Sequence, residues 1–138
     1  MVRIAIEGGH PLTGNFQPSG NKNAAIPILA ATLLDSSTTT LRNIPWTVEV
    51  DRMVDCIKWL GFKCLISNDQ IEIFPSIPGI STIPSELSLS PQIALLFAPL
   101  LLSIHGMAYF EQIDMTKERI STHLSVLDQF GITINADN

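Results

Sequence analysis

The sequence predicts an α/β (α+β) fold made of two copies of one unit: an apolar helix, a strand, an amphipathic helix and a second strand. Gly61 and Gly131 lie 70 positions apart, and the segments before them share one apolar pattern. Hydrophobic residues make up 46% of the 138 residues, enough for the core of one ordinary domain. Helices of this pattern must pack against a sheet to bury their apolar faces.

The N-terminal residues 1–21 are predicted to form a strand and a turn. Residues 1–7 alternate apolar and polar side chains, which is typical of a strand. They lack the basic start and long apolar stretch of a secretory signal. A polar turn at residues 19–21 then leads into an almost wholly apolar helix, expected at residues 23–34.

The first unit is expected at residues 22–75, after this turn. Its amphipathic helix carries apolar residues at positions that share one helical face. These residues are Val50, Val54, Ile57 and Leu60. Gly61 ends the helix. The strands are expected at residues 38–41, 62–66 and 70–74, with a turn at 67–69 between the last two.

The second unit is expected at residues 76–138. It repeats the pattern with an apolar helix at 91–104, a strand at 107–110 and a strand at 132–135. Its amphipathic stripe consists of Ile120, Leu124, Leu127 and Phe130. Because Asn138 corresponds to Asn68 in the first turn, we expect a truncated or split chain whose last strand pairs with another segment. The alternative is a naturally shorter unit whose sheet edge is covered in another way.

Charge and cysteine content exclude several classes of function. The net charge is −5 and no dense run of Lys or Arg is present, so nucleic acid is not an expected partner. The longest apolar run, residues 93–103, is too short for a membrane span, which needs about 20 residues. Cys56 and Cys64 lie in apolar-patterned segments, as expected for core residues of a cytoplasmic protein.

The polar turn and the start of the first apolar helix form the candidate site. In one interpretation, free backbone N–H groups and the helix dipole attract a phosphate or carboxylate, Lys22 adds a full charge and Asn23 orients a second group. In the other, Ser19 or Asn21 caps a buried helix and Lys22 is a solvated surface charge. Spacing alone favours the cap, because caps of this composition are common.

The candidate site also resembles a known family signature. Residues 19–29, Ser-Gly-Asn-Lys-Asn-Ala-Ala-Ile-Pro-Ile-Leu, are similar to the N-terminal signature of UDP-N-acetylglucosamine enolpyruvyl transferases. The similarity continues through residues 30–34, 41–45, 50–51, 60–61 and 127–134. Enolpyruvylshikimate-phosphate synthases share the repeat but carry Lys-Ser where this chain has Lys22-Asn23. In contrast, residues 88–92 resemble a serine-rich turn of that shikimate branch.

The resemblance implies an inverse α/β prism, of which this chain is an incomplete part. It implies that Lys22 contacts phosphoenolpyruvate and Asn23 the nucleotide sugar, with no metal and no cofactor. The family carries a proton-donating cysteine and an anion-binding arginine in a loop that corresponds to residues 110–119. Asp114 and Arg119 are the candidates for these roles, and the alternatives are a helix cap and a surface charge.

Three functions remain open from the sequence. The first is an N-terminal fragment or split half of an enolpyruvyl transferase, with the missing C-terminal half or a second chain as its partner. The second is an inactive binding or regulatory module derived from the family. The third is a structural domain that forms homo-oligomers through its open sheet edge.

Overall fold

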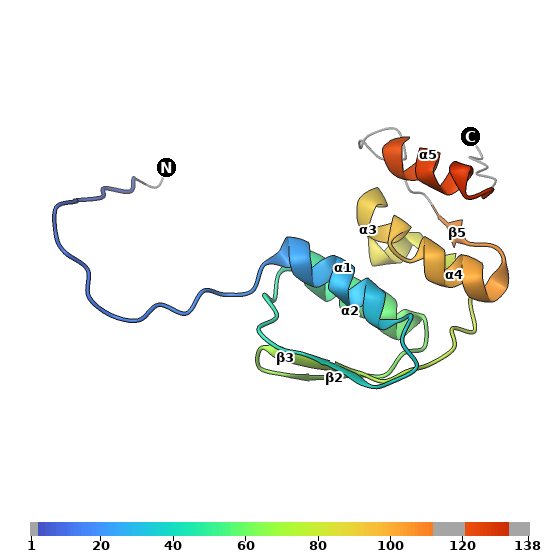
Figure 1. Cartoon of the computed structure of the whole chain (residues 1–138), viewed down its shortest axis with the longest axis horizontal. Coiled ribbons are helices and arrows are strands. Elements are labelled where there is room, and N and C mark those ends of the chain that lie inside the picture. The colour runs from blue at the N-terminus through green and yellow to red at the C-terminus, as the bar shows by residue number, and fades with distance from the viewer. Residues whose placement is uncertain (1–2, 112–120, 133–138) are drawn as a thin grey trace.

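The computed structural model describes residues 3–111 and 121–132 of the chain (Figure 1). Its helices are α1 (Lys22–Thr32), α2 (Val48–Trp59), α3 (Pro91–Leu95), α4 (Ala98–His105) and α5 (Ser121–Gln129), with a short 3-10 helix, η1, at Ser85–Leu87. Its strands are β1 (Thr39–Leu41), β2 (Cys64–Ser67), β3 (Gln70–Ile73), β4 (Thr82–Ile83) and β5 (Tyr109–Phe110). The predicted order of apolar helix, strand and amphipathic helix therefore occurs twice.

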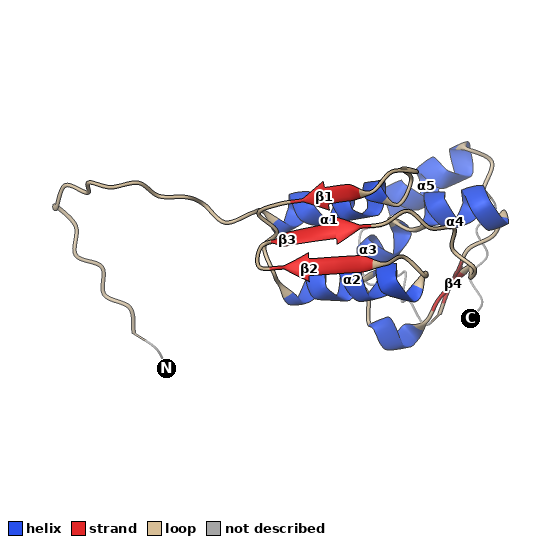
Figure 2. Ribbon diagram, turned by 90° about the horizontal axis from the view of Figure 1, so that it is seen from below, coloured by secondary structure: helices blue, strands red, loops and turns tan. Residues whose placement is uncertain are grey.

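The segment before α1 runs away from the rest of the molecule without regular structure (Figures 1 and 2). Its apolar side chains are exposed, with Ile6 at 91% and Phe16 at 89% of full exposure. The strand predicted at residues 1–7 is therefore wrong for its described part, residues 3–7. A strand needs a neighbouring strand for its backbone hydrogen bonds, and none of the described strands pairs with this segment.

A three-stranded antiparallel sheet forms the base of the first unit, in the order β1-β3-β2. The central strand pairs with both neighbours, since Ile73 lies opposite Thr39 on one side and Cys64 on the other. Helices α1 and α2 cover one face of this sheet (Figure 2). The predicted hairpin is confirmed, and Asn68 in its turn has a φ of 50°.

Helix α2 packs on the sheet through the predicted apolar stripe. Val50, Val54, Ile57 and Leu60 are each at most 2% exposed. Arg52, Asp55 and Lys58 are exposed on the other face. The Thr47 hydroxyl accepts a hydrogen bond from the N–H of Val50 and caps the helix start. Gly61, at a φ of 94°, ends the helix as predicted.

The apolar helix predicted at residues 91–104 is divided into α3 and α4. The reason is Pro99, which has no N–H to donate to the carbonyl of Leu95 and whose ring would collide with that carbonyl in a continuous helix. The chain therefore tightens at the junction, where the N–H of Phe97 bonds to the carbonyl of Ala94 over 3.0 Å. Helix α4 ends at Gly106, at a φ of 70°.

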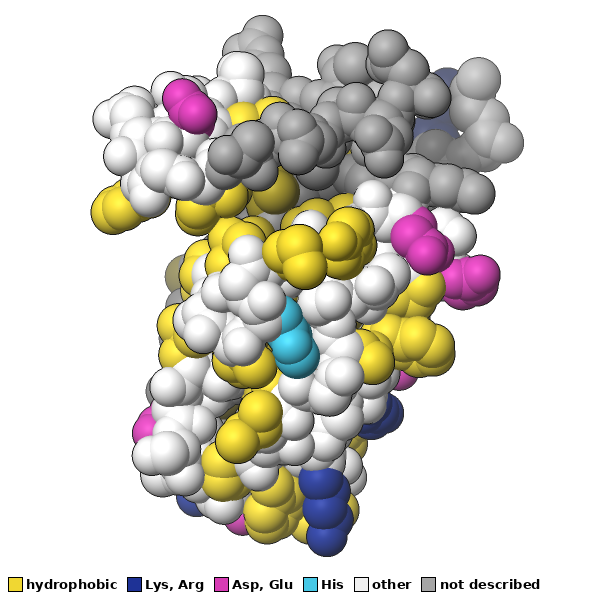
Figure 3. Space-filling view, turned by 90° about the vertical axis from the view of Figure 1, so that its right-hand side faces the viewer, with side chains coloured by type: hydrophobic (Ala, Val, Ile, Leu, Met, Phe, Trp, Pro, Cys, Tyr) yellow, Lys and Arg dark blue, Asp and Glu magenta, His cyan; other side chains and the backbone are white. Residues whose placement is uncertain are grey.

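The second unit is less completely packed in its described part. Strands β4 and β5 form a two-stranded parallel sheet. Helix α5 has no buried residue, and Phe130 after it is 81% exposed. Figure 3 views this end of the molecule, where hydrophobic side chains are more numerous than charged ones. The predicted strand at 132–135 lies, apart from Ile132, outside the described residues, as does Ile120.

Candidate functional site

The turn before α1 packs closely against the loop that follows β1. A Cβ atom added to Gly20 would lie 1.9 Å from the carbonyl oxygen of Asn43 and 2.9 Å from Cδ of Pro45. No other residue type fits at this approach without displacement of the backbone. Two sequence segments that carry the family resemblance, residues 19–29 and 41–45, are thus in contact.

The start of α1 is capped by Asn21. Its side-chain oxygen accepts a hydrogen bond from the N–H of Asn23 over 2.8 Å, and its carbonyl accepts from Ala24 and Ala25 over 3.1 and 2.9 Å. The predicted cap is therefore confirmed for Asn21. The expectation of free backbone N–H groups is wrong for Asn23, Ala24 and Ala25, because all three already donate within the turn.

The ammonium of Lys22 forms an ion pair with Glu49. Nζ of Lys22 lies 2.6 Å from Oε1 of Glu49, and the two side chains are 46% and 41% exposed. The pair joins the first turn of α1 to the first turn of α2. Lys22 is thus an exposed cation with a defined partner, and this exposure is compatible with both interpretations of the residue.

The environment of Glu49 favours its charged form. The hydrogen bond from Lys22 is the main reason that the pKa of Glu49 falls to about 2, and its own backbone N–H and the Thr47 hydroxyl lower the pKa further. Glu49 is the site residue that the sequence did not reveal. Its position in the first turn of α2, two residues after the cap Thr47, was the available signal.

Asn23 lies beside Lys22 on the exposed first turn of α1. Pro27 follows it inside the helix and has no N–H, so the carbonyl of Asn23 receives no hydrogen bond from the residue four positions later. Lys22 and Asn23 are thus both exposed at the start of α1. The other two candidates, Asp114 and Arg119, lie outside the described residues.

The cysteines and the acidic residues offer no further chemistry in the described ranges. Burial raises the pKa of Cys56 to about 12, and it also raises the pKa of Cys64. Both thiols therefore stay protonated, in agreement with their predicted place in the core. Among the described residues, no three His, Cys, Asp or Glu side chains gather as a metal ion would require. None of the described helices is long and apolar enough to cross a membrane.

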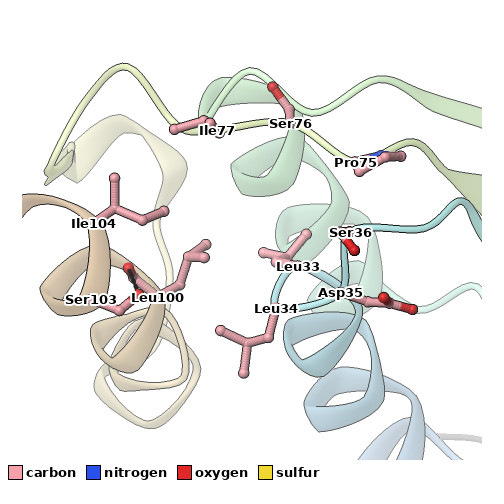
Figure 4. Close-up of a pocket in the computed structure, with 10 residues that line it drawn as sticks. All are labelled: Leu33, Leu34, Asp35, Ser36, Pro75, Ser76, Ile77, Leu100, Ser103 and Ile104. Atoms are coloured by element: carbon pink, nitrogen blue, oxygen red, sulfur yellow. Dashed lines mark hydrogen bonds between the residues drawn. The ribbon is translucent and has the colours of Figure 1, made fainter.

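A hollow of about 390 Å³ lies at the other end of α1, between the residues that follow α1 and helix α4 (Figure 4). Leu33, Leu34, Leu100 and Ile104 are among the apolar residues that line it. The 11-residue α1 separates it from Lys22 by roughly 15 Å, at about 1.5 Å of helix per residue. The hollow is therefore not part of the Lys22 site.

Comparison with known proteins decides the family. The family model described as EPSP synthase (3-phosphoshikimate 1-carboxyvinyltransferase) matches residues 6–138. The chain belongs to the enolpyruvyl transferase family. The family predicted from residues 19–29 is thus confirmed.

Individual enolpyruvyl transferases match over almost the whole chain. UDP-N-acetylglucosamine 1-carboxyvinyltransferase of Bradyrhizobium diazoefficiens is 30% identical over 98% of this chain and 32% of its own length. That of Cellvibrio japonicus is 32% identical over 99% of this chain and 34% of its own length. The chain therefore spans about a third of these relatives.

A solved structure confirms the fold class. The crystal structure of the enolpyruvyl transferase NikO from Streptomyces tendae superimposes with a TM-score of 0.72 at 23% identity. The match covers 94% of this chain and 29% of that one. The described helices and strands thus form part of the enolpyruvyl transferase fold, as predicted.

Proposed function

We propose that the chain is the N-terminal part of an enolpyruvyl transferase that moves the enolpyruvyl group of phosphoenolpyruvate to UDP-N-acetylglucosamine or a similar acceptor. The observation that carries this proposal is the accessible Lys22-Asn23 pair at the start of α1. It lies in a chain that aligns almost end to end with UDP-N-acetylglucosamine 1-carboxyvinyltransferases.

Lys22 is suited to bind the phosphate or carboxylate of phosphoenolpyruvate. Its ammonium is partly exposed and lies at the helix start, where the dipole of α1 also favours an anion. Asn23 has an amide side chain on the same exposed turn, which suits a hydroxyl or amide of the nucleotide sugar. Positive charge here would stabilise negative charge that develops during the reaction.

The proposed reaction is an addition followed by an elimination. The acceptor hydroxyl oxygen bonds to C2 of phosphoenolpyruvate and releases its proton to a base, while the methylene carbon takes up a proton. The C2–O bond to phosphate then breaks, the new methyl group loses a proton, and inorganic phosphate leaves with the enolpyruvyl ether formed. We propose Asp114 as the proton donor and Arg119 as a second anion contact.

We propose that the chain acts together with a complementary part, since it spans about a third of its relatives' length. We propose that the two units, at residues 22–75 and 76–138, form part of one prism. The remainder of the enzyme, on the same or another polypeptide, would close over the Lys22 site.

Reconstitution tests this function. The chain is mixed with the part of the Cellvibrio japonicus relative that it does not cover, and phosphate release from phosphoenolpyruvate is followed with UDP-N-acetylglucosamine present. We expect turnover from the mixture, none from either part alone, and loss of turnover with Lys22→Ala.

Lys58→Ala is the matched control, because Lys58 is also an ion-paired lysine and its side chain is 47% exposed. It should leave turnover unchanged. Phosphoenolpyruvate binding that needs Lys22 but never leads to turnover would favour the inactive binding module. Binding that is equal in wild type and Lys22→Ala would contradict the proposed site.

A further inference from the structure

The ammonium of Lys22 is already paired with an anionic group of the same chain, the carboxylate of Glu49. Glu49 approaches it to 2.6 Å across the first turns of α1 and α2. The backbone N–H groups of Asn23, Ala24 and Ala25 are bonded to Asn21. An incoming anion would therefore meet a site whose donors are largely in use.

Glu49 is the partner of Lys22, and the other charged residues of α2 either interact elsewhere or form no ion pair. On α2, Arg52 lies one turn after Glu49, but its Nη1 donates to the carbonyl of Ser88 over 3.1 Å. Lys58 pairs with Asp55, at 3.9 Å. Asp51 is exposed and forms no ion pair among the described residues.

We propose that Glu49 is a built-in counter-ion of Lys22, which the anionic group of phosphoenolpyruvate displaces when it binds. Glu49 is then a positioning residue: it holds the ammonium at the start of α1 in the free chain and sets the affinity of the site. This inference rests on the proposed function, because it takes Lys22 as the phosphoenolpyruvate contact.

The exchange is feasible because the ion pair is exposed and because other groups besides Lys22 favour the charged form of Glu49. The ion pair is largely exposed to water, and exposed pairs of this kind are weak. The backbone N–H of Glu49 and the Thr47 hydroxyl also lower the pKa of Glu49 and so favour its charged form independently of Lys22. Two negative groups at one ammonium repel each other, so the carboxylate and the ligand are expected to exclude one another.

Calorimetric titration with phosphoenolpyruvate at low ionic strength tests the exchange. Glu49→Gln keeps the size of the side chain and removes its charge, so we expect binding about fivefold tighter than in wild type. Asp51→Asn removes the same charge two positions later on α2 and should change the affinity by less than about twofold. Glu49→Gln combined with Lys22→Ala should not bind.

The carboxyl ¹³C signal of Glu49 gives a second readout, independent of stability. In the exchange, saturation of the wild type with phosphoenolpyruvate moves this signal to its position in Lys22→Ala. A signal that stays in place at saturation, or a Glu49→Gln variant that binds no more tightly, would overturn the inference. If binding still needs Lys22 in that case, the proposed function stands. If neither wild type nor Glu49→Gln binds, both fail.

Discussion

The two units of the chain carry the same local pattern but differ in how they are packed. In the first, the N–H groups of Gly61 and Phe62 bond to the carbonyls of Lys58 and Ile57 over 2.9 and 3.2 Å. In the second, Gly131 and Ile132 bond to Asp128 and Leu127 over 2.8 and 3.1 Å, at the same spacing. Yet α2 buries five residues and α5 buries none.

Local sequence is enough to form a helix and its end, whereas burial of that helix requires a sheet. A helix and its glycine end form from nearby residues, so both units show them. Burial of the apolar stripe requires a partner surface. Helix α2 has the sheet β1-β3-β2 beneath it, whereas in the described part of the second unit β5 pairs only with β4.

The largest expected effect is on the buried stripe. Ile57→Ala should destabilise the chain by about 2–5 kcal/mol, because it leaves a cavity at a side chain with no exposure. Leu127→Ala is the equivalent change on α5, where this side chain is only half-buried, and it should cost less than about 1 kcal/mol. Urea unfolding measures both, and equal costs would show that α5 is as well packed as α2.

The next largest effect on stability is expected at Gly20, which lies against the backbone of Asn43 beside the candidate site. Gly20→Ala should cost about 1–3 kcal/mol, because the new methyl group would overlap the carbonyl of Asn43. Gly79→Ala is the control, since no atom lies within 4 Å of its added Cβ. Thermal unfolding should separate the two variants, and an unchanged midpoint for Gly20→Ala would refute the contact.

Loss of a helix cap should have a smaller effect on stability, and the effect should again be larger in the first unit than in the second. Thr47→Ala should cost about 1 kcal/mol by removing the cap of α2. Ser90→Ala removes the cap of α3, a helix of only five residues, and should cost less. Urea unfolding of the two variants tests this order, and a larger cost at Ser90 would contradict it.

The smallest effect concerns Glu49 and pH. Its pKa is about 2 in the folded chain and 4.5 ordinarily, so its stabilising contribution is complete above about 4.5 and is lost as the pH falls towards 2. The stability difference between wild type and Glu49→Gln should therefore shrink over this range. Unfolding measured at several pH values tests it, and a difference that does not change with pH would count against the ion pair.

Local patterns predicted much of the fold and little of the site. The stripe of α2 and the turns at Gly61 and Gly131 depend on neighbouring residues, and they were predicted correctly. The division of the predicted helix at Pro99 was not predicted, because the apolar residues on both sides of the proline indicated one continuous helix. The contact between Lys22 and Glu49 joins residues 27 positions apart, and a periodic pattern of neighbouring residues does not predict such a contact.

The repeat also relates the site to residues outside the described ranges. A shift of 70 positions places Arg119 where Glu49 lies in the first unit. Equivalent sequence positions of the two units therefore carry an acid in one and a base in the other. This is consistent with Arg119 as an anion contact, which stays a prediction.

A residue-resolved NMR titration of the ¹⁵N-labelled chain with phosphoenolpyruvate tests the central claim most directly. We predict that the shift changes concentrate at Lys22, Asn23 and the first turn of α1, and that Lys22→Ala removes them. Changes confined to the hollow beside Leu34 and Ile104, or an unchanged response in Lys22→Ala, would contradict the assignment of the site.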